Sequence, residues 1–121
     1  FLTMARAEAR NAMTWDMYEA LVEACDEVDR RDDLRVFVIR SAGDKAFIAG
    51  TDIGQFTAFA TAADAVAYER HLDRVVDRLE RVRVPTIAQV QGVAAGGGCA
   101  IALACDLRVC APGASFGMPI A

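Results

Sequence analysis

Apolar side chains recur at helical spacing along two long stretches of the chain. The spacing over residues 15–29 predicts a helix that Thr14 caps, with Asp16 near the positive end of the helix dipole. A second stripe predicts a longer amphipathic helix over residues 64–82, which Pro85 stops. The predicted buried positions are Met17, Leu21, Ala24, Cys25 and Val28 in the first helix, and Val66, Leu72, Val75, Val76, Leu79 and Val82 in the second.

Short apolar runs rich in β-branched residues lie between the helical stretches. Residues 36–40, 86–91 and 107–110 are predicted to form parallel strands, and the length and β-branched content of the first of these favour a buried one. Residues 46–49 form a further extended piece that ends at Gly50. A helix of small residues is expected over 98–105. Because strand and helix alternate, the sequence predicts a single α/β domain over residues 1–121, with mostly parallel strands and right-handed crossovers.

Composition narrows the functional classes. The chain of 121 residues is 55% hydrophobic and 25% charged, which is typical of one folded globular domain. A net charge of -4 argues against a nucleic-acid partner, and the absence of an apolar run of about 18 residues argues against a membrane span. Neither end shows a cap or a polar fringe, so we expect the chain to be part of a longer protein.

The cysteine and histidine content points to a reduced, metal-free protein. None of the cysteines has the C-x-x-C spacing, and the single histidine leaves too few ligands for a zinc site. Buried, reduced thiols at Cys25, Cys99, Cys105 and Cys110 are therefore expected, in a cytoplasmic protein without a bound metal.

Two turns carry the most distinctive pattern for chemistry. One is Ala49–Ile53, where a strand runs into a turn, and the other is Gly92–Cys99, where three glycines precede a helix. Glycines there free backbone N–H groups at a helix N-terminus, where the dipole favours negative charge. Two such turns could direct two donors at one oxygen and form an oxyanion hole, although tight strand–helix packing explains the glycines equally well. The sequence contains neither a phosphate-binding P-loop nor a G-x-S-x-G nucleophile turn.

Five segments in this order and spacing resemble the crotonase (enoyl-CoA hydratase/isomerase) superfamily: Glu8–Met13, Lys45–Ile53, Pro85–Cys99, Ala102–Arg108 and Phe116–Pro119. The resemblance implies a spiral of ββα units that binds coenzyme A thioesters and lacks, in this chain, the C-terminal helical part. It also implies homotrimers or hexamers, a role in fatty acid metabolism, and no permanently bound cofactor, since coenzyme A arrives as part of the substrate.

The same resemblance assigns roles to individual positions. The backbone N–H groups of Thr51 and Gly97 would hold the thioester oxygen. The substrate would lie along Lys45, Ala46, Phe47, Ile48, Ala49 and Gly96.

The chain departs from the family at the two positions where hydratases carry glutamates, because these are Ala100 and Ile120 here. Hydration of an enoyl thioester needs a general base and a general acid. Asp52 and His71 are the candidate substitutes, although a helix cap and a core-edge histidine are the simpler interpretations of these two residues. The sequence therefore predicts an acyl-CoA lyase or isomerase other than a standard hydratase. The alternative is a catalytically silent homologue that binds CoA esters or serves in assembly.

Overall fold

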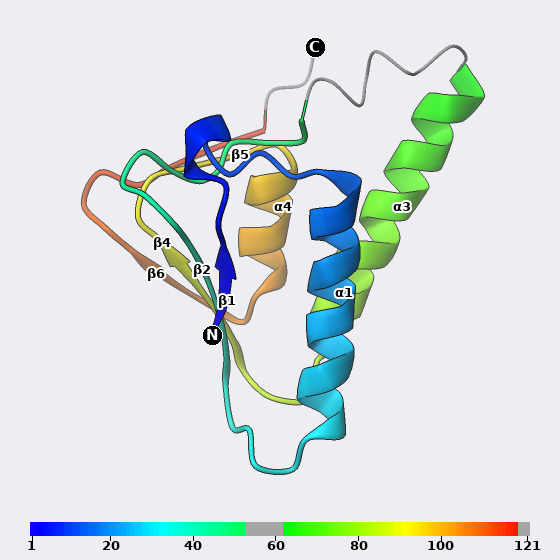
Figure 1. The fold of residues 1–121 in the computed structure, drawn as a ribbon, viewed down its shortest axis with the longest axis vertical. Helices are drawn as coiled ribbons and strands as arrows, with labels where there is room; N and C mark the ends of the chain where they lie inside the picture. Colours follow the sequence, from blue (N-terminus) through cyan, green and yellow to red (C-terminus); the bar gives the residue numbers. More distant parts are fainter. Residues whose placement is uncertain (53–61, 119–121) are drawn as a thin grey trace.

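Two parallel sheets and three α-helices make up residues 1–52 and 62–118, the part of the chain that this computed structural model describes (Figure 1). One sheet has the order β1-β2-β4-β6 and the other the order β3-β5-β7. The strands are β1 (Leu2–Met4), β2 (Phe37–Ser41), β3 (Ala46–Ile48), β4 (Thr86–Val90), β5 (Val93–Ala95), β6 (Leu107–Cys110) and β7 (Ser115–Gly117). The helices are α1 (Trp15–Arg30), α3 (Ala62–Glu80) and α4 (Gly97–Ala104), with a 3-10 turn η1 (Ala7–Ala9).

The layers place α4 at the centre of this arrangement. In Figure 1, α4 stands between the strands and α1, and it packs on β3, β4 and β5. Helix α3 runs beside α1 and contacts both α1 and α4. Arg78 links α3 to α1, because its guanidinium donates to Asp26 at 2.9 Å and to Asp29 at 2.7 Å, both on α1.

The structure confirms the predicted fold class. Strands β2, β4 and β6 and helices α1, α3 and α4 lie where the sequence predicts them, within two residues at each end, and the described strand pairs are parallel. Thr14 caps α1, since its side chain accepts the Met17 N–H at 3.2 Å. Strands β5 and β7 were not predicted from the sequence. Each has only three residues, some of them Ala or Gly, so neither shows a clear alternation of apolar and polar residues.

Three burial predictions need correction. Val66, expected in the buried stripe of α3, is 45% exposed, because the fully buried residues of that helix, Val75 and Leu79, lie in its C-terminal half. Tyr18, and not its neighbour Met17, is the fully buried residue of that turn of α1. Cys110 is exposed, whereas Cys25, Cys99 and Cys105 are buried as expected. The reason for the exception is that β6 is an edge strand of its sheet and none of its residues is covered by the rest of the described chain. Burial raises the pKa of the Cys25 and Cys105 thiols to about 11, so both stay protonated and unreactive near neutral pH.

A buried asparagine holds the N-terminal loop against β3. Asn11 is 1% exposed and has a φ of 56°. Its Oδ1 accepts the Arg6 N–H at 2.8 Å, and its Nδ2 donates to the carbonyls of Ala42 at 2.9 Å and Ala46 at 3.0 Å. Asparagine suits this place because its side chain bonds to nearby backbone and it tolerates left-handed φ.

Asn11→Ala is expected to lower the free energy of unfolding by about 3 kcal/mol, because it removes three hydrogen bonds of a buried side chain at about 1 kcal/mol each. Urea denaturation of the complete protein measures the change. Arg10→Ala is the matched control, since Arg10 also has a positive φ of 52° but is exposed, and its cost should stay within about 0.5 kcal/mol. Equal losses in the two variants would show that backbone strain, and not the hydrogen bonds, sets the stability here.

Candidate functional site

The two turns singled out in the sequence pack directly against each other. Strands β3 and β5 are parallel neighbours, so the turns that follow them lie at the same edge of the sheet. A Cβ placed on Gly50 would lie 3.7 Å from the Ala95 carbonyl oxygen, and one placed on Gly96 would lie 3.7 Å from the Gly50 Cα. The left-handed φ values of Gly50 (110°) and Gly96 (55°) explain why both corners are glycine.

The hydrogen bonds around Thr51 leave its amide available. Met13 bridges the residues on either side, because the Met13 N–H donates to the Gly50 carbonyl at 2.8 Å and the Asp52 N–H donates to the Met13 carbonyl at 2.9 Å. Gly97 is the first residue of α4, where amides have no acceptor within the helix. Within residues 1–52 and 62–118, neither the Thr51 nor the Gly97 amide has a hydrogen-bond acceptor.

Close packing also demands two of the glycines. A Cβ on Gly98 would overlap the carbonyl of Ile48 in β3, and one on Gly97 would overlap the hydroxyl of Tyr18. The packing interpretation that the sequence left open therefore holds at Gly98. At Gly97 the neighbour is a polar side chain, and the Thr51 Oγ1 would lie 3.5 Å from the same Cβ.

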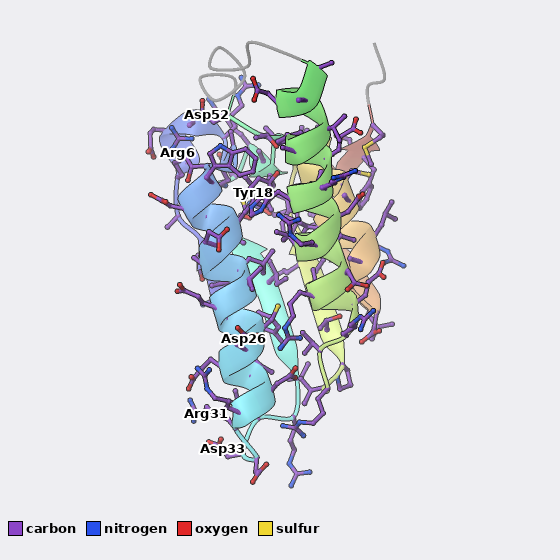
Figure 2. The ribbon with its side chains drawn as sticks, turned by 90° about the vertical axis from the view of Figure 1, so that its right-hand side faces the viewer. Arg6, Tyr18, Asp26, Arg31, Asp33 and Asp52 are labelled. Carbon is purple, nitrogen blue, oxygen red and sulfur yellow. The ribbon has the colours of Figure 1, made fainter. Side chains whose placement is uncertain are left out.

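Three hydroxyl groups meet beside Gly97. Tyr18 Oη lies 2.7 Å from Thr51 Oγ1, which lies 2.5 Å from Tyr68 Oη. Figure 2 shows Tyr18 between α1 and α3. Burial raises the pKa of the Tyr18 hydroxyl well above its usual value, so the group remains a neutral donor. Sequence reasoning missed both tyrosines, although a tyrosine three residues before Leu21, on the buried face of α1, was a readable signal.

The two candidate acid–base residues have different neighbours. Asp52 forms an ion pair with Arg6 at 2.7 Å, near the top of α1 in Figure 2, and Arg6 also donates to the Ala12 carbonyl at 3.0 Å. His71 lies on α3, with its ring 4.7 Å from that of Trp15 in edge contact and its Nε2 3.5 Å from Glu19 Oε1. A proton-transfer role for either residue stays a prediction.

The predicted substrate-binding stretch divides into open and buried parts. Lys45 and Ala46 help to line a cavity of about 270 Å³, and Ala49 and Thr51 line one of about 300 Å³. Phe47 and Ile48 are fully buried, so neither residue offers surface to a ligand among the described residues.

Gly96 and Ala100 frame the start of α4, whose first turn holds no acidic residue. Ile120 lies outside the described residues.

Two features are absent from the part of the chain that the structure describes. Residues 1–52 and 62–118 contain no cluster of three or more His, Cys, Asp or Glu residues arranged to hold a metal ion. Among the helices described there, none has the length and apolarity needed to cross a membrane.

Comparison with known proteins places this geometry in a family. The profile of the enoyl-CoA hydratase/isomerase family matches residues 1–121. The chain belongs to this family. Among curated relatives of this family member, the short-chain-enoyl-CoA hydratase of Clostridium acetobutylicum is 33% identical over 98% of this chain and 45% of the relative. The fatty acid oxidation complex subunit alpha of Colwellia psychrerythraea is 39% identical over 88% of this chain and 14% of the relative.

The fold is also similar to solved structures of the same family. The crystal structure of an enoyl-CoA hydratase/carnithine racemase from Magnetospirillum magneticum superposes with a TM-score of 0.91 and 34% identity, over 98% of this chain and 45% of that chain. The fold is therefore that of the crotonase superfamily, and the chain spans less than half the length of the hydratases it matches.

Gly97→Ala should cost about 1–3 kcal/mol of stability through overpacking, because the new methyl group overlaps the Tyr18 hydroxyl. Adding Tyr18→Phe should recover most of that loss, since the nearest remaining atom, Cζ of the ring, lies 3.6 Å from the new Cβ. Thermal unfolding of the wild type, both single variants and the double variant forms the cycle that measures this coupling. Additive losses would mean that the hydroxyl does not fill the space left by the glycine.

Proposed function

We propose that the complete protein binds an acyl-CoA thioester and stabilises negative charge on the thioester oxygen with the backbone amides of Thr51 and Gly97. The proposal is supported by the contact between the two turns that hold Thr51 and Gly97, because neither amide has an acceptor among residues 1–52 and 62–118. The CoA hydratases among the relatives support the substrate class.

The chemistry follows from the placement of these donors. A thioester carbonyl that becomes an enolate or a tetrahedral oxyanion gains charge on oxygen, and fixed N–H groups stabilise that charge without reorganising. The N-terminus of α4 adds a partial positive charge at the same place. Both effects act more strongly in the transition state than on the neutral substrate, which is the condition for accelerating the reaction.

The reaction we propose is a lyase or isomerase step other than plain hydration. Hydration needs a base for water and an acid for the α-carbon. The first turn of α4 offers neither, since Ala100 stands where family hydratases carry a glutamate, and the carboxylate of Asp52 is held by Arg6. The acid or base would then come from elsewhere in the complete protein.

The coenzyme A part of the substrate would run past the start of β3. Lys45 is exposed beside a cavity there, and its ammonium group suits a phosphate of coenzyme A. Coenzyme A would thus be part of the substrate and not a resident cofactor. We also propose that the complete protein forms homotrimers or hexamers in the cytoplasm.

One observation favours a second candidate function. Ala100 removes an acid–base group without disturbing the two turns, which suits a silent homologue that binds CoA esters or serves in assembly. Such a protein would bind acyl-CoA esters and turn none of them over.

A matched pair of variants isolates the Gly97 amide in the complete protein. Gly97→Ala and Gly97→Pro both add a Cβ that meets the Tyr18 hydroxyl, but only proline deletes the N–H, and proline is tolerated at the first position of a helix. We expect turnover in the proline variant to be about 100- to 1,000-fold lower than in the alanine variant. A panel of acyl-CoA esters supplies the substrates, with circular dichroism as the folding control.

Calorimetry with the same esters separates the outcomes. Binding without turnover in the wild type would favour the silent homologue. Equal turnover in the two folded variants would contradict the role of the Gly97 amide, and the absence of binding at millimolar ester would remove the substrate class itself.

A further inference from the structure

Three hydroxyl-bearing side chains from separate parts of the chain converge on the proposed oxyanion site. Tyr18 belongs to α1, Thr51 to the turn after β3, and Tyr68 to α3. Thr51 Oγ1 is the middle of this row of three hydroxyls, with Tyr18 Oη on one side at 2.7 Å and Tyr68 Oη on the other at 2.5 Å. Tyr18 is fully buried, whereas Thr51 and Tyr68 are partly exposed, so the hydroxyl chain runs outward from the core.

The turn that carries Thr51 needs external support. Gly50, just before it, has no side chain to anchor it and takes up a φ of 110°. The bridge to Met13 holds the Gly50 carbonyl, which shares a planar peptide unit with the Thr51 N–H, and it holds the amide of Asp52, but it makes no bond to the Thr51 side chain. The side chain of Thr51 is fixed by the two tyrosine hydroxyls. The tyrosines therefore add a second anchor, on the side chain, to the peptide plane that Met13 holds at the Gly50 carbonyl. A small tilt of that plane would misdirect the Thr51 N–H, and misplacement of a catalytic donor slows a reaction.

Packing alone does not explain a hydroxyl at position 18. The other buried residues of α1 are Leu21, Cys25 and Val28, and a phenylalanine would fill the core at Tyr18 equally well. Burying a hydroxyl is unfavourable unless it is hydrogen-bonded. The Tyr18 hydroxyl occupies the space that a side chain on Gly97 would need, so it contacts one turn of the site and bonds to the other.

We propose that Tyr18 and Tyr68 are positioning residues of the thioester site, which act through the Thr51 hydroxyl to hold the Thr51 amide in line with that of Gly97. This inference rests on the proposed function and extends it to two side chains. The raised pKa of Tyr18 agrees with this role, because a neutral hydroxyl keeps its hydrogen bond across the physiological pH range.

The test uses 2,4-hexadienoyl-CoA, a conjugated thioester whose ultraviolet absorption moves to longer wavelength when its carbonyl is polarised. The complete protein is compared with Tyr18→Phe, Tyr68→Phe, Thr51→Val and Thr51→Ser. Spectra of the bound thioester report carbonyl polarisation, and calorimetry gives the Kd. The matched control is Thr86→Val, since Thr86 also has a buried hydroxyl that hydrogen-bonds, in its case to Asp106, but lies on β4 away from the turns.

We expect the wild type to show the wavelength shift, and Tyr18→Phe, Tyr68→Phe and Thr51→Val to lose most of it while their Kd stays within about threefold, because the remote coenzyme A contacts are unchanged. Thr51→Ser should keep the shift, since it keeps the hydroxyl. Thr86→Val should lose stability and keep the full shift. The Tyr18→Phe/Tyr68→Phe double variant should be no worse than either single variant, because each breaks the same hydroxyl chain.

The outcomes separate the two claims. A full shift in folded Tyr18→Phe and Tyr68→Phe would overturn the positioning role and leave the proposed oxyanion site standing. A wild type that binds the thioester without any shift would overturn the oxyanion site, and the positioning role with it. If a tyrosine variant fails to fold, the Thr51→Val and Thr51→Ser pair decides, and equal shifts in these two would overturn the positioning role.

Discussion

The contact between the turns after β3 and β5 constrains the rest of this structure. It requires parallel neighbouring strands, so that both turns fall at one edge of a sheet. It requires glycine at the start of α4, since a Cβ at Gly98 would overlap the Ile48 carbonyl. Helix α4 can therefore sit directly on β3, and its first amide comes close to the turn that carries Thr51. The same glycine turn thus allows the close packing and holds the amide that the proposed chemistry needs, so neither interpretation excludes the other.

The surrounding elements keep this contact in place. Asn11 accepts the Arg6 N–H within the N-terminal loop and ties that loop to the carbonyls of Ala42 and Ala46, the latter at the start of β3. Arg78 joins α3 to α1 by its ion pairs with Asp26 and Asp29. The hydroxyls of Tyr18 and Tyr68 join the same two helices through Thr51. Residues far apart in the sequence therefore set the geometry of a turn that contains no rigid residue of its own.

Much of this fold could be predicted from the sequence, because local patterns specify it. Helical spacing and the Thr14 cap located α1, and the β-branched run 86–91 located β4. The glycines at 96–98 located the turn before α4, and the resemblance of five segments gave the family. The second sheet could not be predicted in detail, since strands as short as β5 and β7 have no periodicity and depend on their neighbours for pairing.

Less of the candidate site than of the fold could be predicted from the sequence, because the site depends on contacts between residues far apart in the sequence. The positions of Thr51 and Gly97 followed from the resemblance, but nothing in the sequence places Tyr18 or Tyr68 next to them. Asp52 illustrates the same limit, since its partner Arg6 lies 46 positions away along the numbering of the chain. Sequence patterns indicate which face of a helix is buried. Only the three-dimensional structure shows which residues that face contacts.

The central claim is that two backbone amides bind and polarise a thioester oxygen. The most direct measurement is the infrared carbonyl stretch of an acyl-CoA ester labelled with carbon-13 at its thioester carbon, recorded free in water and bound to the complete protein. The account predicts a bound band at distinctly lower frequency, because two fixed donors weaken the carbonyl double bond more than mobile water does. A bound band at or above the frequency in water would contradict it.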